Sequence, residues 1–396
     1  MEKLSRRRFL VQSAVSVAAL GAAPAFLSAI PRKMRLPNPQ DSGIDHVIVL
    51  MMENRSFDHL LGWLAGGNGA QAGLVYTDTN GVAQATYPLA PDFQGCGHKD
   101  PDHSYEGGRI ELNGGKCDGW LRADNDEFAI GYYVQADLPF LGQAAPEWTT
   151  FSRYFSPIMA STYPNRMYQH AGVTDRLDNS VALSSLPTIW DRLADAGRTG
   201  LYYASDAPFL ALWGPKYVPI TRSFDAFVDD CAAGTLPDVA FVDPPFIDST
   251  NGTSSDDHPF SDIRAGESFM YRVYRAVTTS PAWERTVLFI NFDEWGGFFE
   301  TVAPDTAPDV DPRFQLRGFR VPALVVSPLA RRGHVAHTLY DHTSILNMIE
   351  WRWGLDPLSR RDAKANNIAE VLDFSSAPNL AATDYMVPAF ASPACP

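Results

Sequence analysis

The chain has 396 residues, of which 45% are hydrophobic and 20% are charged, so it can bury a large core. Its formal net charge of -14 at pH 7 argues against a basic nucleic-acid-binding face and against a polybasic grip on anionic lipid. The length suits either two domains or one large α/β domain with insertions.

Residues 1–30 are predicted to be a targeting segment and not part of the fold. Arg6 and Arg7 precede an apolar stretch, residues 11–30, which ends in small side chains. This pattern is typical of a twin-arginine signal peptide. An uncleaved membrane anchor is the alternative, but polar residues and a proline make the stretch a weak bilayer span. Because the twin-arginine export machinery carries folded proteins, we expect a periplasmic, cell-surface or secreted protein.

A Pro-rich linker, residues 31–43, leads to the first strand. Residues 47–52 form an unbroken apolar run, which predicts a strand buried on both faces at the centre of a parallel sheet. Glu53 and Asn54 follow directly, and open α/β sheets bind ligands at the carboxyl ends of their strands. The alternative is an ordinary loop between a strand and a helix.

Residues 66–146 are rich in Gly, Asp, Asn and aromatic side chains and have poor periodicity. We interpret them as a long insertion of loops and short elements that lies over the site like a lid. His103 stands in an Asp- and His-rich stretch of this insertion and is a candidate for the wall of a pocket. A solvated turn is the alternative for any single histidine here.

The four cysteines have neither zinc-site spacing nor a CxxC pair. In an oxidising compartment Cys96 and Cys117 could close a loop within the insertion. The connectivity of four cysteines cannot be read from sequence, so the pairing of Cys231 and Cys395 stays open.

Thr162 stands two residues before Pro164, a spacing that suits the first turn of a helix. A hydroxyl at a helix N-terminus has backbone N–H groups and the positive end of the helix dipole nearby, which favours an incoming phosphate. Asn165 and Arg166 would supply further donors. The alternative is an ordinary Thr cap, the more common use of Thr at this position.

The second half of the chain repeats the pattern of the first strand. The apolar run at residues 286–292 predicts another buried strand, and Asp293 and Glu294 follow it directly. Residues 374–396 are rich in Pro and Ala, and we expect a loosely packed tail. Further strands are expected at residues 200–203, 239–242 and 321–327, and helices at residues 185–197, 265–279 and 342–353.

The two strand ends together suggest a chemistry. Glu53, Asn54, Asp293 and Glu294 carry the oxygen ligands that hard cations such as Ca²⁺, Mg²⁺ or Mn²⁺ prefer. A divalent ion beside Thr162 would activate its hydroxyl and clamp a phosphoryl oxygen. The threonine could then attack phosphorus and form a phosphothreonine that water hydrolyses. A nearby histidine could protonate the leaving alkoxide.

Seven ordered motifs carry a resemblance to a known family. They are ENRSFDH, DPDHSYEGG, NGGKCDGW, TYPNR, DDHPFSDIRAGE, FDEWGGFFE and YDHTSIL, which together span about residues 44–360. In these motifs the chain resembles the phosphoesterase family of bacterial phospholipases C and acid phosphatases, within the alkaline phosphatase superfamily. The resemblance implies one α/β domain at residues 44–373, a three-layer sandwich whose mostly parallel central sheet has helices on both faces and loop insertions over the site.

The resemblance also implies roles for individual residues. The metal-binding pairs of the family match Glu53 with Asn54 and Asp293 with Glu294. Its Ser/Thr nucleophile, which also contacts the metal, matches Thr162.

The pocket histidines of the family match His103 and His258, which become candidates for proton transfer. Asn165, Asp257 and His342 are candidate substrate-binding residues, with His342 the less certain match.

Two positions depart from the family pattern. The family commonly has His where this chain has Trp295, and Asp-His where it has Glu300 and Thr301. These departures put the substrate pocket in doubt more than the chemistry.

The resemblance implies hydrolysis of phosphate esters, and two substrate classes remain. A phospholipase C would cut phosphatidylcholine-like lipids on the glycerol side of phosphate, whereas an acid phosphatase would act on soluble phosphomonoesters. We favour the phospholipase C. A sulfatase is disfavoured, because oxidation of Thr162 would give a ketone where sulfatases need an aldehyde. A non-catalytic exported binding protein with a vestigial site is the hypothesis from a different class.

A phospholipase C needs an apolar cleft for its diacylglycerol leaving group. Seven aromatic residues could line one, although most aromatic side chains belong to the core: Phe128, Tyr132, Tyr133, Phe140, Trp148, Phe298 and Phe299.

Overall fold

The computed structural model describes residues 36–247 and 251–396. The predicted targeting segment, residues 1–30, and the first part of the predicted linker lie outside this description. Within the described residues, no helix has both the length and the apolar content that a bilayer crossing requires.

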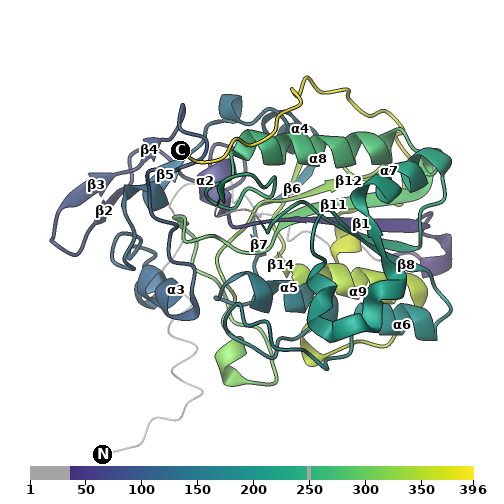
Figure 1. Ribbon diagram of the computed structural model, residues 1–396. Coiled ribbons are helices and arrows are strands. Elements are labelled where there is room, and N and C mark those ends of the chain that lie inside the picture. The colour runs from purple at the N-terminus through teal and green to yellow at the C-terminus, as the bar shows by residue number, and fades with distance from the viewer. Residues whose placement is uncertain (1–35, 248–250) are drawn as a thin grey trace, which may run out of the picture. The chain divides into compact units, whose positions relative to one another are not determined.

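A central sheet of eight strands is formed within the described residues by β1 (His46–Met52), β6 (Thr149–Phe151), β8 (Gly200–Ala204), β9 (Thr221–Ser223), β10 (Val239–Asp243), β11 (Thr286–Phe292), β12 (Ala323–Val326) and β13 (His334–Ala336). Their order is β13-β6-β12-β11-β1-β10-β8-β9 (Figure 1). From β9 to β11 all neighbours are parallel, whereas β12 is antiparallel to β11 and β6. The sheet is therefore mostly parallel, as predicted.

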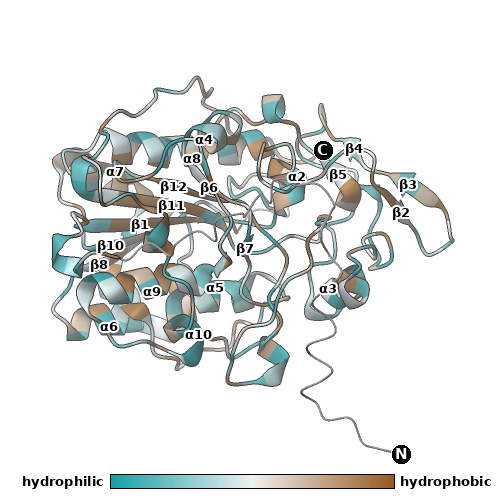
Figure 2. Ribbon diagram, turned by 180° about the vertical axis from the view of Figure 1, so that it is seen from behind, coloured by the Kyte–Doolittle hydropathy of each residue, from teal (hydrophilic) through white to brown (hydrophobic). Residues whose placement is uncertain are grey.

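Helices cover both faces of this sheet, which confirms the three-layer arrangement (Figures 1 and 2). One face carries α4 (Leu141–Glu147), α7 (Phe224–Ala233) and α8 (Ile263–Thr278). The other face carries α5 (Thr162–Ala171), α6 (Ile189–Asp195), α9 (His342–Trp353) and α10 (Arg360–Ala363).

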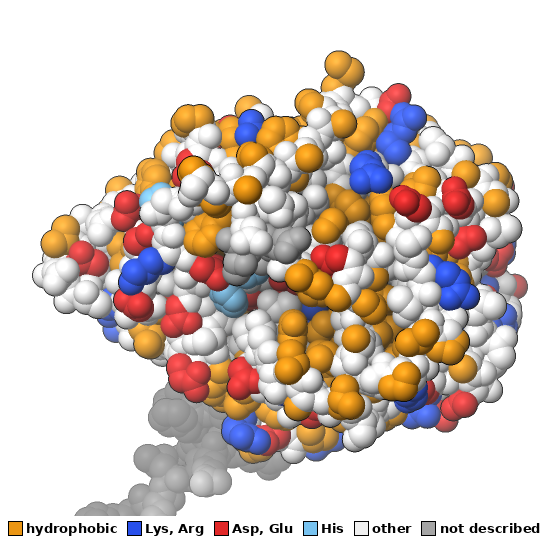
Figure 3. Space-filling view, in the orientation of Figure 1, with side chains coloured by type: hydrophobic (Ala, Val, Ile, Leu, Met, Phe, Trp, Pro, Cys, Tyr) orange, Lys and Arg blue, Asp and Glu red, His pale blue; other side chains and the backbone are white. Residues whose placement is uncertain are grey.

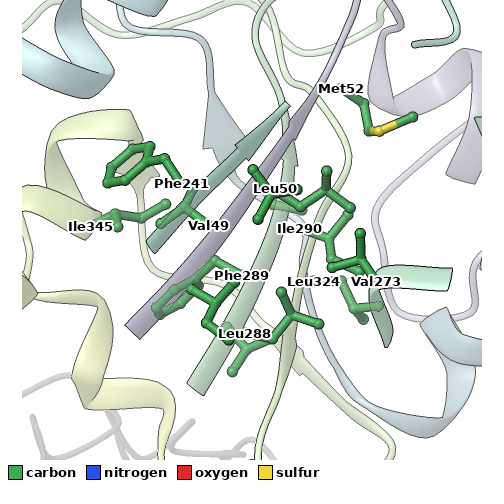
Figure 4. Close-up of a cluster of buried hydrophobic side chains, with 14 of the residues drawn as sticks. Val49, Leu50, Met52, Phe241, Val273, Leu288, Phe289, Ile290, Leu324 and Ile345 are labelled. Atoms are coloured by element: carbon green, nitrogen blue, oxygen red, sulfur yellow. The ribbon is translucent and has the colours of Figure 1, made fainter. Parts of the chain in front are cut away.

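The two central strands are apolar along their length because helices cover both of their faces. Strand β1 is buried from Val47 to Met52, and β11 is buried throughout. Leu50 of β1 and Ile290 of β11 are register partners, and Figure 4 shows them in one cluster of buried side chains. Burial of each such side chain contributes roughly 1.5–3 kcal/mol. The strands predicted at residues 47–52 and 286–292 are thus confirmed.

The predicted insertion at residues 66–146 contains short elements beyond one end of the central sheet (Figure 1). A cluster of buried side chains, including Trp120, Trp295 and Phe319, packs the insertion against the strand ends. The insertion is therefore anchored directly beside the candidate site. Its elements are β2 (Val75–Thr77), β3 (Ala83–Ala85), β4 (Tyr87–Pro88), α3 (Tyr105–Leu112) and β5 (Gly131–Tyr132). Outside it lie α2 (Phe57–Leu61) and the paired strands β7 (Tyr154–Phe155) and β14 (Tyr340–Asp341).

The aromatic side chains proposed for an apolar cleft are core residues instead. All seven are at most 7% exposed, and they belong to the two main hydrophobic clusters. The core alternative is therefore confirmed for Phe128, Tyr132, Tyr133, Phe140, Trp148, Phe298 and Phe299.

The predicted pairing of Cys96 with Cys117 is wrong. Cys96 forms a disulfide with Cys395, 299 residues away, and Cys117 and Cys231 are free and buried. Cys117 packs in the same apolar cluster as Trp120, and this burial holds its thiol away from Cys96.

The tail, residues 374–396, is mostly exposed but is fixed to the domain at several points by hydrogen bonds and a disulfide. Tyr385 is buried, accepts a hydrogen bond from the indole of Trp148 and donates one to Glu147. In Figure 1 the tail runs along α8 and returns toward the insertion, where Cys395 fixes it. The composition of the tail suggested a solvated segment, because composition does not reveal which distant residues, such as Trp148 and Glu147, will bind it.

Candidate active site

The carboxyl ends of β1 and β11 meet at one edge of the sheet because the two strands are parallel neighbours. One oxygen of Asp293 accepts hydrogen bonds from the backbone N–H groups of Asn54 at 3.0 Å and of Glu294 at 2.7 Å. Asn54 has φ +55°, and a Cβ at Gly296 would lie 2.1 Å from its carbonyl oxygen. The glycine is therefore required for the two strand ends to approach this closely.

Thr162 is the first residue of α5 and is 4% exposed. Its hydroxyl lies 3.4 Å from the side-chain oxygen of Asn54, to which it donates. The predicted threonine, the Glu53–Asn54 pair and the Asp293–Glu294 pair therefore lie in one group.

Asn165 supports the approach to α5. Its side-chain oxygen accepts from the N–H of Ile158, and its amide nitrogen donates to the carbonyls of Ala160 at 2.7 Å and Ser161 at 3.0 Å. Both amide protons are used within the chain. In this arrangement Asn165 has no donor left for the substrate-binding role predicted for it.

Arg166 lies among carboxylates. Its guanidinium is 2.8 Å from Glu53, 3.0 Å from Asp243 and 3.7 Å from Asp293, and it is 1% exposed. Burial alone would lower the pKa of Arg166, but Asp243 and Glu53 raise it well above its ordinary value, so the charge is kept. The guanidinium thus neutralises the acidic strand ends, and one of its terminal nitrogens has no hydrogen-bond partner.

The acidic pair at the end of β11 has unsatisfied oxygens. One oxygen of Asp293 and one of Glu294 are buried without a hydrogen-bond partner. Burial raises the pKa of both carboxyls well above the ordinary value, with repulsion from Glu53 adding for Asp293. Buried, unpaired carboxylate oxygens beside an amide oxygen are the donor set of a hard divalent cation, so these residues fit one.

His103 presents a ring nitrogen to this group, and His258 lies beside His103. Nδ1 of His103 donates to the Pro101 carbonyl at 2.7 Å, and its Nε2 lies 3.3 Å from the Asn54 amide and 4.0 Å from Glu294. Nδ1 of His258 is held by the Pro259 carbonyl. A backbone carbonyl at Nδ1 fixes the tautomer and leaves Nε2 free to act.

The two histidine rings lie 5.6 Å apart and nearly perpendicular. Asp100 lies beside the two rings, and one of its carboxylate oxygens is 3.9 Å from Nε2 of His258. Asp100, His103 and His258 each offer a ligand atom within 4.8 Å of the others, so they could also hold a metal ion. Figure 3 shows histidine and acidic side chains together at a hollow in the surface.

His342 does not offer a nitrogen to a substrate. Its Nε2 donates to the Asp293 carbonyl at 2.8 Å, and its Nδ1 accepts from the Tyr154 hydroxyl at 3.1 Å. Burial lowers the pKa of His342 to about 4, so the ring is neutral. Through its hydrogen bond to the Asp293 carbonyl, His342 supports the backbone at the end of β11.

Asp257, another predicted substrate-binding residue, packs against α8. A Cβ at Gly266 would lie 1.9 Å from one of its carboxylate oxygens, and its carbonyl accepts from Arg55 at 2.7 Å. The side chain is 1% exposed.

Its neighbour, Asp256, is a buried residue beside the site that was not among the predicted site residues. One oxygen of this buried carboxylate has no partner, and its carbonyl accepts from the backbone N–H of Glu53 at 2.7 Å. Burial, with repulsion from Glu53, raises the pKa of Asp256 to about 8. Two consecutive aspartates before His258 were the sequence feature that indicated Asp256. Asp243 is the last residue of β10, so it could have been predicted as a site residue from its position at the end of a buried strand.

The departures from the family pattern have packing roles. The Trp295 indole donates to Glu111 of α3 at 2.7 Å and so ties the insertion to the end of β11. Glu300 pairs with the buried Arg320 at 2.6 Å, and Thr301 bonds to Asp58 at 2.8 Å.

Comparison with known proteins places these motifs. The family model described as Phosphoesterase family matches residues 44–356. Phospholipase C B of Mycobacterium tuberculosis is 29% identical over 468 aligned residues, covering 96% of this chain and 87% of the relative. Non-specific phospholipase C1 of Arabidopsis thaliana is 28% identical, covering 86% of this chain and 73% of the relative.

Among solved structures, a protein in the alkaline phosphatase superfamily from Vibrio parahaemolyticus aligns with a TM-score of 0.41 at 10% identity, covering 83% of this chain and 72% of that one. The family match spans most of the chain and includes both strand ends and Thr162. The prediction made from the seven motifs is confirmed: the chain belongs to the phosphoesterase family and is a phosphoric ester hydrolase.

Proposed function

We propose that this protein is an exported, metal-dependent phosphoesterase with Thr162 as its nucleophile, and that it acts as a phospholipase C on phosphatidylcholine-like lipids. The observation that carries the proposal is the position of the Thr162 hydroxyl. It lies at the N-terminus of α5, bonded to Asn54, beside two carboxylates with unpaired oxygens. A nucleophile, a cation-binding set and the positive end of a helix dipole are thereby combined.

Glu53, Asn54, Thr162, Asp293 and Glu294 would hold a divalent cation such as Ca²⁺, Mg²⁺ or Mn²⁺. When bound, such an ion supplies Lewis-acid stabilisation of charge on a phosphoryl oxygen. Its charge would also offset the mutual repulsion of these buried carboxylates.

Thr162 would attack phosphorus, forming its Oγ–P bond while the bond from phosphorus to the leaving alkoxide oxygen breaks. The hydroxyl proton of Thr162 would pass to solvent, and His103 or His258 would give the leaving alkoxide a proton through Nε2. The same nitrogen would then take a proton from the water that attacks phosphorus; this releases phosphocholine and leaves the Oγ of Thr162, which regains a proton from solvent. The backbone N–H of Thr162, at the N-terminus of α5, would meet charge on a non-bridging oxygen, since Tyr163 donates to Asn179 and Pro164 has no N–H.

The lipid substrate is inferred from two observations. Relatives from a bacterium and a plant, matched over most of this chain, are phospholipases C. Exposed apolar side chains also lie near Thr162: Asn179 accepts from the N–H of Tyr163 at 2.8 Å, and Val181 and Leu183, on the same segment, are 75% and 71% exposed. Apolar side chains at a site mouth suit a substrate that resides in a membrane.

Export is inferred from the paired arginines and the apolar stretch that follows them. The enzyme would then hydrolyse its phosphate ester outside the cytoplasm. We expect no nucleic-acid partner.

The deciding experiment compares phosphatidylcholine, sphingomyelin and p-nitrophenyl phosphate as substrates of the purified protein, with and without chelator. We expect release of phosphocholine and diacylglycerol from phosphatidylcholine, and loss of this activity in chelator. Hydrolysis of the monoester alone would identify an acid phosphatase instead. Turnover of none of the three, with any divalent ion, would favour the binding protein.

A further inference from the structure

We propose that residues 390–396 act as a brace that positions the two histidines of the site. The brace joins two loops that are far apart in the chain. One loop, residues 92–104, carries His103, and the other, residues 251–262, carries His258. The kinetic part of the test rests on the proposed function, whereas the structural part does not.

The brace is bound to the first loop by a covalent and a polar contact. The disulfide from Cys395 to Cys96 reaches this loop seven residues before His103. The side chain of Gln94 donates to the Pro393 carbonyl at 2.6 Å and lies 3.3 Å from the Ser392 hydroxyl.

The same few residues bind the second loop. The backbone N–H of Asp262 donates to the Ser392 hydroxyl at 2.8 Å, and that hydroxyl donates to the Gly252 carbonyl. The N–H of Cys395 donates to the Asn251 carbonyl at 3.1 Å. Ser392 and Cys395 thus each bind both loops.

The three segments meet around Gly252 without spare room. A Cβ there would lie 2.9 Å from the Phe260 carbonyl, 3.1 Å from the Gln94 amide nitrogen and 3.2 Å from the sulfur of Cys395. Gly252 also has φ +80°, a conformation that favours glycine. This junction is therefore built for close contact between the two loops and the brace.

Arg264, which follows the second loop at the start of α8, adds an aromatic contact. Its guanidinium lies 4.3 Å from the ring centre of Phe93 and 4.4 Å from that of Phe390. It is therefore stacked between the first loop and the brace.

The brace bears on chemistry because the two loops are irregular segments and their histidines are 5.6 Å apart. Loops without a ladder of backbone hydrogen bonds move more readily than strands or helices. A displacement of about 1 Å in an active-site group can lower a rate by as much as about a hundredfold. By tying both loops to one short segment, the brace holds His103 and His258 at a fixed separation.

The brace is opened by a dithiol reductant. The reductant transfers two electrons, the bond between Cys96 and Cys395 breaks, each sulfur takes up one proton, and the reductant becomes a cyclic disulfide. Cys117 and Cys231 are free thiols, which a dithiol does not reduce, so the reagent acts on the disulfide of the brace.

The test compares wild-type protein with Cys395→Ala and with the double variant Cys395→Ala/Ser392→Ala. Cys231→Ala is the matched control, because it removes a buried thiol from α7, away from the brace. Hydrogen exchange of residues 92–104 and 251–262 is measured first. We expect faster exchange in both loops of the two brace variants and of reduced wild-type protein, unchanged exchange in β1 and β11, and wild-type behaviour in the control.

Hydrolysis of p-nitrophenylphosphorylcholine gives the second readout. We expect kcat to fall about tenfold to a hundredfold with a smaller change in KM, and to recover when the reduced wild-type protein is reoxidised. Because this rescue uses the unmodified chain, it also decides the matter if the variants fold poorly. Unchanged exchange in both loops, or an unchanged kcat in reduced protein, would overturn the brace while leaving the proposed function in place. If oxidised wild-type protein hydrolyses no ester, the proposed function fails and the exchange data alone judge the brace.

Discussion

The hydroxyl of Thr162 lies 3.4 Å from the side-chain oxygen of Asn54, although 108 residues separate them in the chain. The contact exists because α5 begins at the edge of the sheet where β1 ends. It joins a nucleophile candidate to a strand end that Asp293 also binds through the Asn54 N–H. Changes at any of these positions should therefore affect one reaction.

Thr162→Ala should lower kcat by about a thousandfold or more, because it removes the attacking oxygen and leaves the fold intact. Thr162→Ser keeps the oxygen and should retain measurable activity. Ser161→Ala is the control, since the Ser161 side chain makes no capping hydrogen bond on α5. Hydrolysis of p-nitrophenylphosphorylcholine is the assay, and near-normal turnover by Thr162→Ala would refute the nucleophile assignment.

Glu294→Gln should weaken binding of Ca²⁺, Mg²⁺ or Mn²⁺ by at least about tenfold, because it removes the charge of a carboxylate with an unpaired oxygen. Glu111→Gln is the matched control. Glu111 is equally buried and its pKa is also raised well above the ordinary value by burial, but both of its oxygens are bonded, to Trp295 and Asn125. Titration calorimetry on chelator-treated protein measures both, and equal losses would remove the specific role of Glu294.

Metal-free protein should become less stable as pH rises from about 5 to about 8. Burial raises the pKa values of Asp256, Glu267 and Glu300 to about 8, from ordinary values of 3.8 to 4.5. In this range the folded chain keeps protons that the unfolded chain has lost, so deprotonation favours unfolding. Thermal unfolding of chelator-treated protein between pH 5 and pH 8 measures the effect.

Asp256→Asn should flatten that pH dependence, and the exposed Asp229→Asn should not. Added divalent cation should raise the unfolding temperature more at pH 8 than at pH 5, because it binds the ionised carboxylates. A stability that rises over this range in chelator would contradict the buried carboxylates described above.

Arg166→Met should cost about 3–5 kcal/mol of stability, because it leaves the buried carboxylates of Glu53 and Asp243 without their cation. Arg313→Met, which breaks an exposed pair with Asp311, should have no measurable effect. Urea denaturation distinguishes the two. If Arg166→Met unfolds like wild type and only weakens substrate binding, the phosphate-donor interpretation of this residue would be favoured.

Val181→Ser with Leu183→Ser should lower hydrolysis of phosphatidylcholine in vesicles several-fold and leave hydrolysis of a monomeric short-chain ester unchanged. Both side chains are exposed on the segment that follows Asn179, which binds the N–H of Tyr163. Val75→Ser with Val82→Ser is the control, because these side chains are 60% and 55% exposed in and beside the small β2–β3 sheet. Equal effects on the two substrates would exclude a membrane-facing role.

The sequence predicted the site where local pattern determines position. Two apolar runs identified β1 and β11, and parallel neighbours must bring Glu53, Asn54, Asp293 and Glu294 to one edge. The spacing of Thr162 and Pro164 placed the threonine at the start of a helix. The match to the phosphoesterase family then follows from the order of these motifs.

Predictions from the sequence were wrong or incomplete where the role of a residue depends on partners that are distant in the chain. Arg166 reads as a phosphate donor within its motif, but its neighbours in the fold are Glu53 and Asp243, 113 and 77 residues away. The disulfide of Cys96 was mispaired for the same reason, since its partner lies beyond most of the domain. Local composition holds no information about such distant contacts.

The span of that disulfide also orders events in the life of the protein. Cys395 is synthesised 299 residues after Cys96, so the covalent link closes on a chain whose sheet is already complete in sequence. For a chain exported in the folded state, both sulfurs are thiols in the reducing cytoplasm and meet an oxidant after translocation. The proposed brace would then form only after translocation, on a domain that is already folded.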